Sequence, residues 1–85
     1  MKQTKPEWVD RAVGTSKFHK EKLRQFPSWT AKKTAIALNR SIGAISEELM
    51  LASFLKTYEN DLYKCEFHHE AIEWVRNKKR ELDKE

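Results

Sequence analysis

The stretch that decides the fold is residues 30–49, TAKKTAIALNRSIGAISEEL. Thr30 is a typical N-cap, because its hydroxyl can accept a hydrogen bond from a free backbone N–H two or three residues later. Asn39 tolerates the left-handed conformation that a helix exit needs, and Ser41 is a second N-cap candidate directly after it. The spacing predicts a short helix between Thr30 and Asn39 and a long helix from Ser41 to about Tyr58.

Apolar residues recur at helical spacing along both segments. Ala35 is small, so the two helices can cross closely, and Ile45 is expected to fill the space against Ala35 and Leu38. The inner face of the long helix is predicted to carry Ile42, Ile45, Leu49 and Ala52. A short bend between steeply angled helices leaves the N-terminal end of the second helix, called its front below, projecting outward. Such a front fits the major groove of B-DNA, which is about 12 Å wide.

Two further helices are predicted before this stretch. Pro6 is expected at the first position of one helix and Gly14 just beyond its end. Thr15 or Ser16 then caps a second helix that ends at Phe26, before Pro27. The inward-facing positions of this second helix are predicted to be Phe18, Leu23 and Phe26.

A last helix is predicted from about His68 to Leu82, after a loop at residues 59–61. Its buried positions are expected to be Ala71, Ile72, Val75 and Leu82. No segment alternates with the period of a strand. The sequence therefore predicts an all-α fold, a compact bundle of about five helices in one domain of residues 1–85, with its central two-helix unit over residues 30–55.

Composition narrows the cellular context. Cys65 is the one cysteine among 85 residues, which excludes an internal disulfide and fits a reducing compartment. No run approaches about 18 apolar residues, and no apolar segment follows the basic N-terminus, so neither a membrane span nor a signal peptide is expected. We expect a cytoplasmic protein of a bacterium or phage-infected cell, or a nuclear one if the source is eukaryotic.

Charge is sorted along the chain, whose net charge is +4. Residues 1–45 hold ten Lys/Arg against three Asp/Glu, net +7, whereas residues 46–85 hold seven against ten, net −3. A domain with one positive end attracts and orients a polyanion. DNA is a common partner of this kind, because neutralising its phosphates releases condensed counterions.

One pattern joins Trp29-Thr30, Ala35, Asn39-Arg40-Ser41 and Ile45. With these residues the segment resembles the helix-turn-helix of the ParB and KorB partition proteins and their small phage and plasmid relatives. The likeness extends more loosely over residues 23–82. It implies a DNA-binding module that acts as a transcriptional repressor or regulator, or as a centromere-type or origin-type binding protein.

Two features depart from that family. Asn39 replaces the usual glycine of the turn, and Glu47 and Glu48 add negative charge to the second turn of the presumed reading helix. The chain also lacks the nucleotide-binding domain of ParB, so no CTPase activity is carried over. We therefore expect no enzyme activity, no catalytic residues and no cofactor.

Three groups of residues are expected to contact DNA. The first helix is expected to contact phosphate through Thr30, Lys32 and Lys33. The front of the second helix is expected to face base edges or nearby backbone through Arg40, Ser41, Gly43, Ala44, Ser46 and Glu47, with Ala44 a candidate for a thymine methyl group. Further backbone clamps are expected at Lys17, Lys20 and Arg24. For each lysine the competing interpretation is a solvated helix face.

Other interpretations stay open. A helix-turn-helix scaffold can serve as a protein-interaction adaptor or inhibitor that reads no DNA, and Glu47 and Glu48 favour that function. A single module of this kind reads few base pairs, so DNA binding would favour a homodimer on paired half-sites. Its interface is expected at Leu51, Phe54 and Tyr58, or at Trp74 and Leu82. Cys65, His68 and His69 offer too few ligands for a zinc site, so no metal is expected.

Overall fold

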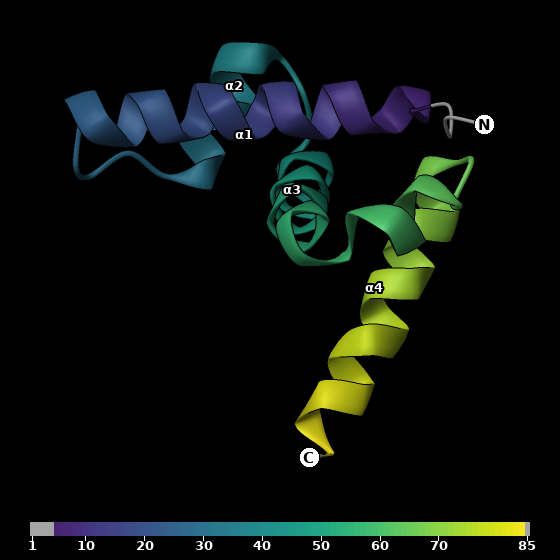
Figure 1. The fold of residues 1–85 in the computed structure, drawn as a ribbon. Coiled ribbons are helices and arrows are strands. Elements are labelled where there is room, and N and C mark those ends of the chain that lie inside the picture. Colours follow the sequence, from purple (N-terminus) through teal and green to yellow (C-terminus); the bar gives the residue numbers. More distant parts are fainter. Residues whose placement is uncertain (1–4, 85) are drawn as a thin grey trace.

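Four helices make up residues 5–84, the part of the chain that the computed structural model describes. They are α1 (Glu7–Gln25), α2 (Ala31–Leu38), α3 (Ile42–Tyr63) and α4 (His68–Asp83). In Figure 1, α1 lies across α3, which is seen end-on, and α4 runs away from this crossing. The described residues contain no strand, so the all-α prediction is confirmed, with four helices in place of five. None of the four is long and apolar enough to cross a membrane.

The two helices predicted before Pro27 are one continuous helix. α1 passes through Gly14, which has no positive φ. Thr15 and Ser16, the predicted N-caps, are buried inside α1. They extend the buried stripe that begins at Trp8, and this packing outweighs the roughly 1 kcal/mol by which glycine disfavours a helix. Pro6, predicted as the first helical residue, is the N-cap instead.

α3 is longer than predicted. Its backbone leaves the helical region at Tyr58, with φ −120° and ψ 35°, and then resumes to Tyr63. The loop expected at residues 59–61 is therefore a helical turn beyond a kink. The turn brings Leu62 into the core, where it is fully buried, and this burial offsets the weak helix preference of Asn60 and Asp61.

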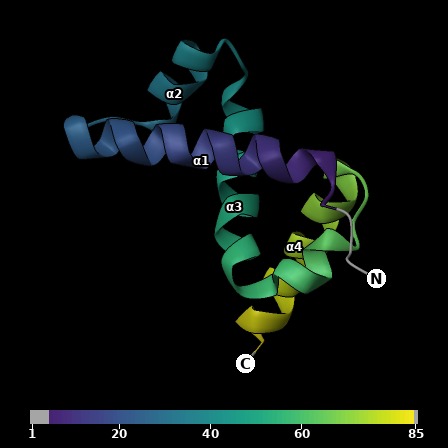
Figure 2. The ribbon, with the colours of Figure 1, turned by 45° about the horizontal axis from the view of Figure 1, so that its top comes forward.

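The main core lies where α1, α3 and α4 meet (Figure 2). It consists of Trp8, Val9, Ala12, Leu51, Leu55, Leu62, Ala71, Ile72 and Val75. The indole Nε1–H of Trp8 donates to the backbone carbonyl of Cys65 at 2.7 Å, which ties the start of α1 to the loop before α4. The last helix matches its prediction to within one residue. Its first turn is fixed by the Phe67 backbone N–H, which donates to Glu70 Oε1 at 3.1 Å.

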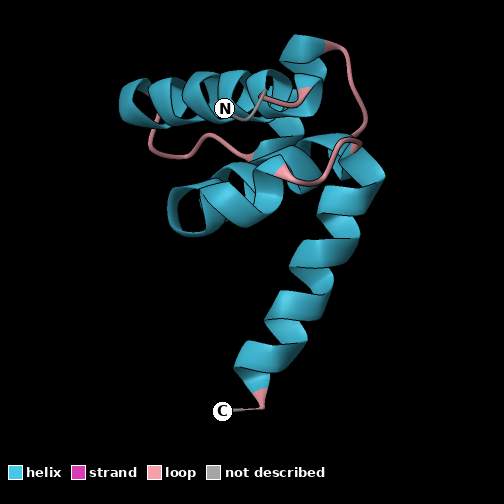
Figure 3. Ribbon diagram, turned by 45° about the vertical axis from the view of Figure 1, so that its right-hand side comes forward, coloured by secondary structure: helices cyan, strands magenta, loops and turns pink. Residues whose placement is uncertain are grey.

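Four residues predicted to face inward are exposed instead. They are Leu23, Phe26, Ile42 and Leu82. Leu23 and Phe26 lie in and just after the last turns of α1, and Leu82 lies near the end of α4, which projects from the body in Figure 3. Helical spacing predicts which residues share a face but not how far a neighbouring helix covers that face. Leu23, Phe26 and Leu82 lie at helix ends, and Ile42 faces the hollow between α2 and α3.

α2 is anchored by a hydroxyl that the sequence did not single out. Thr34 is fully buried. Its Oγ1 accepts a hydrogen bond from Trp29 Nε1 at 2.7 Å and lies 2.7 Å from His19 Nδ1 of α1. A buried hydroxyl has to be hydrogen-bonded to avoid a penalty of about 1–3 kcal/mol. The two partners therefore fix how α2 sits against the second half of α1.

Replacing Gly14 with alanine distinguishes one long α1 from two short helices. A Cβ added at Gly14 meets nothing within 4 Å. Gly14→Ala should therefore raise the free energy of unfolding by about 0.5–1 kcal/mol, since alanine favours a helix interior. Urea unfolding followed by circular dichroism measures the change. A loss of about 1 kcal/mol would instead indicate that Gly14 ends a helix in the left-handed conformation.

Candidate nucleic-acid interface

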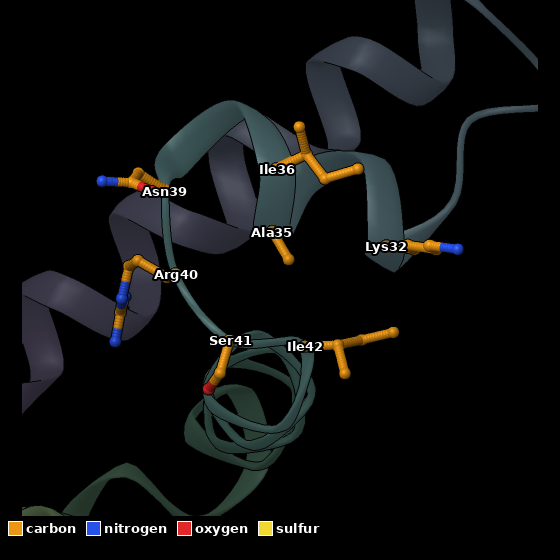
Figure 4. Close-up of a pocket in the computed structure, with 7 residues that line it drawn as sticks. All are labelled: Lys32, Ala35, Ile36, Asn39, Arg40, Ser41 and Ile42. Carbon is orange, nitrogen blue, oxygen red and sulfur yellow. The ribbon is translucent and has the colours of Figure 1, made fainter.

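Three local features, all predicted from the sequence, fix where α2 begins and ends and where α3 begins. Asn39 adopts the left-handed conformation, with φ 56° and ψ 50°, and ends α2. The Thr30 hydroxyl accepts from the Lys33 backbone N–H at 3.3 Å, and the Ser41 hydroxyl accepts from the Ala44 N–H at 3.1 Å. Figure 4 shows the outcome, with α2 running crosswise past the front end of α3.

A buried ion pair links this bend to the rest of the fold. Both guanidinium amino groups of Arg40 donate to the carboxylate of Glu48 on α3. Thr15 of α1 donates its hydroxyl to the same carboxylate at 2.6 Å. The Glu48 side chain is 1% exposed and that of Arg40 is 29% exposed. One carboxylate therefore joins α1, the bend and α3.

The charge state of Glu48 follows from these partners. Burial raises the pKa of the carboxyl, but the hydrogen bonds from Arg40 and Thr15 and the charges of Arg40 and Arg11 outweigh it. The net pKa of Glu48 lies below its usual value. In the same pair, the hydrogen bond to Glu48 raises the pKa of Arg40. Both groups are thus charged at neutral pH.

The roles expected of two of these residues need correction. Arg40 was expected at base edges, yet its guanidinium points inward to Glu48. Glu48 was expected to place negative charge on the outside of the reading helix, yet it is fully buried. Residue spacing could not reveal this, because the pair joins the bend to a position two turns into α3.

Glu47 also lies away from the front of α3. Its Oε1 is 3.2 Å from His68 Nε2, and its Oε2 is 3.7 Å from an Arg76 guanidinium nitrogen. Both partners belong to α4, so Glu47 faces the α3–α4 contact and not the surface beside α2. The expectation that Glu47 lies on the same front as Ser41 is therefore wrong.

The remaining predicted residues do gather at one place. Ser41, Gly43 and Ser46 are exposed at the start of α3, and Ala44 is half-buried beside them. A hollow of about 640 Å³ opens between this front and α2 (Figure 4). It is lined by Lys32, Ala35, Ile36, Asn39, Arg40, Ser41 and Ile42, among which there is no acidic residue.

Cationic side chains lie on both helices that pack against the first half of α3, α2 and α1. Lys32 and Lys33 are exposed on α2, and Lys33 Nζ lies 5.9 Å from the ring centre of Trp29. On α1, the three predicted clamps Lys17, Lys20 and Arg24 are all exposed. They stay candidates for phosphate contact.

The structure adds one lysine that sequence reasoning missed. Lys56 of α3 lines a second hollow together with Lys17 and Lys20 of α1. Its ammonium, through hydrogen bonding and like charge, lowers the pKa of Lys20. Lys56 is distant in sequence from the other basic residues, and only the crossing of α1 over α3 brings it to them.

Within residues 5–84, no three or more His, Cys, Asp or Glu side chains come together as a group that could hold a metal ion. Cys65, His68 and His69 thus form no such group. His68 pairs with Glu47, and the ring of His69 stacks on Phe67 with 5.8 Å between centres.

Comparison of the chain with protein-family models, with curated proteins and with solved structures finds no match. The resemblance to ParB and KorB therefore stays a prediction from the residues that carry it.

Replacing Glu48 with glutamine tests the buried pair. Removing one partner of a buried ion pair costs about 3–5 kcal/mol. Because Arg40 retains some access to water, we expect Glu48→Gln to lower the free energy of unfolding by about 2–3 kcal/mol at neutral pH. The matched control is Glu47→Gln, whose more exposed ion pairs are worth under about 1 kcal/mol.

The pH dependence of this difference has a defined sign. Since the folded-state pKa of Glu48 is lowered, its stabilisation is complete above the unfolded value of about 4.3 and is lost as pH falls through the folded value. The stabilities of wild type and Glu48→Gln should therefore begin to approach each other as pH falls below about 4.3 and should meet only below the folded-state pKa of Glu48. A gap that stays constant down to acid pH would contradict the charged pair.

Proposed function

We propose that α2, the bend and α3 form a helix-turn-helix that binds double-stranded DNA, with the front of α3 in the major groove. The observation that carries the proposal is the exposure of the N-terminal end of α3. Gly43 and Ser46 are exposed on a helix end held crosswise to α2, and Gly43, which has open space around it, allows close approach to a groove floor. The chain would act as a repressor or regulator, or as a centromere-type or origin-type binding protein, of a phage, plasmid or mobile element.

The distribution of charge supports the same partner. Among the salt bridges of the described residues, none involves Lys32 or Lys33, the two lysines of α2 beside the front. Their positive charge is therefore free to meet phosphate, and the hollow next to them contains no carboxylate. Phosphate contacts of this kind supply most of the affinity of non-specific DNA binding.

A second backbone contact is proposed at Lys17, Lys20 and Lys56. These side chains come from two helices and share one hollow, so their like charges repel one another in the free protein. A phosphate bound near them would relieve that repulsion. Glu59 also lines this hollow. Its carboxylate offsets one of the three lysines, and the hollow keeps a net positive charge that can bind a phosphate.

The rival function, a protein-interaction adaptor, loses the feature that favoured it. Glu47 and Glu48 suggested an acidic outer helix unsuited to phosphate. Glu48 is buried against Arg40, and Glu47 pairs with His68 and Arg76. The front of α3 consequently has no acidic side chain to repel a phosphate backbone.

A homodimer on paired half-sites remains part of the proposal, but the interface expected from the sequence changes. Leu51 is fully buried and cannot contact a partner. Tyr58 packs on Phe54 and Trp74 within the fold, with ring centres 5.8 and 5.3 Å apart. Trp74 is half-buried and Leu82, on the projecting end of α4, is 45% exposed, so an interface at these two residues stays a prediction.

Selection from a random duplex library, followed by binding titrations at several salt concentrations, tests the proposed function. Wild-type affinity for a selected duplex should fall about 10³-fold or more between about 50 and 200 mM salt. Lys32→Ala should weaken binding to all duplexes alike and reduce the salt slope by about one. The control is Lys79→Ala, an exposed lysine near the far end of α4, which should change neither quantity.

Two results would contradict the proposed function. One is the absence of measurable duplex affinity at low ionic strength. The other is an affinity that Lys32→Ala and Lys79→Ala reduce equally, since that would indicate diffuse attraction without a defined contact face.

A further inference from the structure

Two large apolar side chains lie at the hollow between α2 and α3. Ile36 on α2 is 71% exposed and Ile42 in the first turn of α3 is 53% exposed. Ala35 also lines the hollow (Figure 4). Large exposed apolar side chains that face one cavity are informative, because burial of that surface by a ligand gains about 25 cal/mol per Å².

The polar groups around this mouth are mostly engaged inside the protein. The Arg40 guanidinium is bound to Glu48, the Ser41 hydroxyl accepts the capping hydrogen bond from Ala44, and Glu47 pairs with α4. Exposed polar side chains remain at Asn39, Ser41 and Ser46. The surface here therefore presents the methyl groups of Ile36 and Ile42 next to a few small polar groups.

The charge of the hollow limits what can occupy it. Lys32 stands at its edge and no carboxylate lines it, so the occupant carries an apolar group on a negatively charged frame. In the major groove of DNA, the thymine C5-methyl is the apolar group that marks a base pair. An apolar segment of another protein would cover the isoleucines but would supply no negative charge for Lys32.

We propose that Ile42, helped by Ile36 across the hollow on α2, reads thymine C5-methyl groups, so that the protein prefers duplexes with thymine opposite the front of α3. This inference rests on the proposed function. It differs from the expectation that Ala44 meets a thymine methyl, because Ala44 is half-buried while Ile42 is exposed. Burial of one methyl group is worth about fourfold in affinity, and of two about fifteenfold.

The experiment compares a selected duplex with the same duplex in which every thymine is replaced by deoxyuridine, which lacks only the methyl group. Wild type should bind the deoxyuridine duplex about fourfold to fifteenfold more weakly. Ile42→Ala should bind the thymine duplex more weakly than wild type does and should keep only the smaller share of the discrimination that Ile36 provides. Ile36→Ala should lose part of the discrimination.

Two controls keep the comparison interpretable. Phe67→Ala removes another exposed apolar side chain, directly before α4, and should discriminate as wild type does. Ile42→Val keeps a branched side chain and should retain most of the discrimination, which guards against a folding defect in Ile42→Ala. Thermal unfolding of each variant should match wild type, since Ile42 is exposed.

The outcomes separate this inference from the proposed function. Equal wild-type affinity for the thymine and deoxyuridine duplexes would overturn methyl readout while leaving duplex binding intact. Unchanged discrimination in Ile42→Ala would also overturn the assignment. No affinity for any duplex would overturn the proposed function and this inference together, and would favour a protein ligand for the apolar mouth.

Discussion

The fold around the bend depends on one buried carboxylate. Glu48 accepts hydrogen bonds from Arg40 in the bend and from Thr15 in α1. A buried charge is tolerated only when it is paired and hydrogen-bonded, so these three residues must keep their relative positions whenever the protein is folded. This requirement fixes α3 against both α1 and the exit from α2. It makes the crossing of α2 and α3 a rigid feature of the molecule.

The same interaction shapes the surface that the bend presents. Because Arg40 is turned inward, the strongest hydrogen-bond donor of the bend is withdrawn from the front of α3. Glu47 is likewise drawn to His68 and Arg76 on α4. What is left outside is apolar at Ile36 and Ile42 and cationic at Lys32. A surface of this composition favours a ligand whose frame is anionic and whose readable edge carries methyl groups.

Local chemistry made the bend predictable from the sequence. The caps at Thr30 and Ser41 and the left-handed Asn39 depend on residues a few positions apart, and all three were predicted correctly. Tertiary packing decided what the sequence could not: Gly14 stays helical because a buried stripe continues past it, and Ile42 is exposed because it faces the open hollow between α2 and α3. The same holds for the candidate site. The positions of Glu48 and Lys56 beside residues of α1 depend on how α1 crosses α3, which the sequence does not reveal.

The most direct test of the central claim is a ¹H–¹⁵N NMR titration of the protein with a selected duplex. The claim that α3 enters DNA front-first predicts that the backbone amide signals of Gly43, Ser46 and Lys32 shift most. Signals from the last turns of α4 should stay in place. Shifts concentrated on α4, or no shifts at any duplex concentration, would contradict that claim.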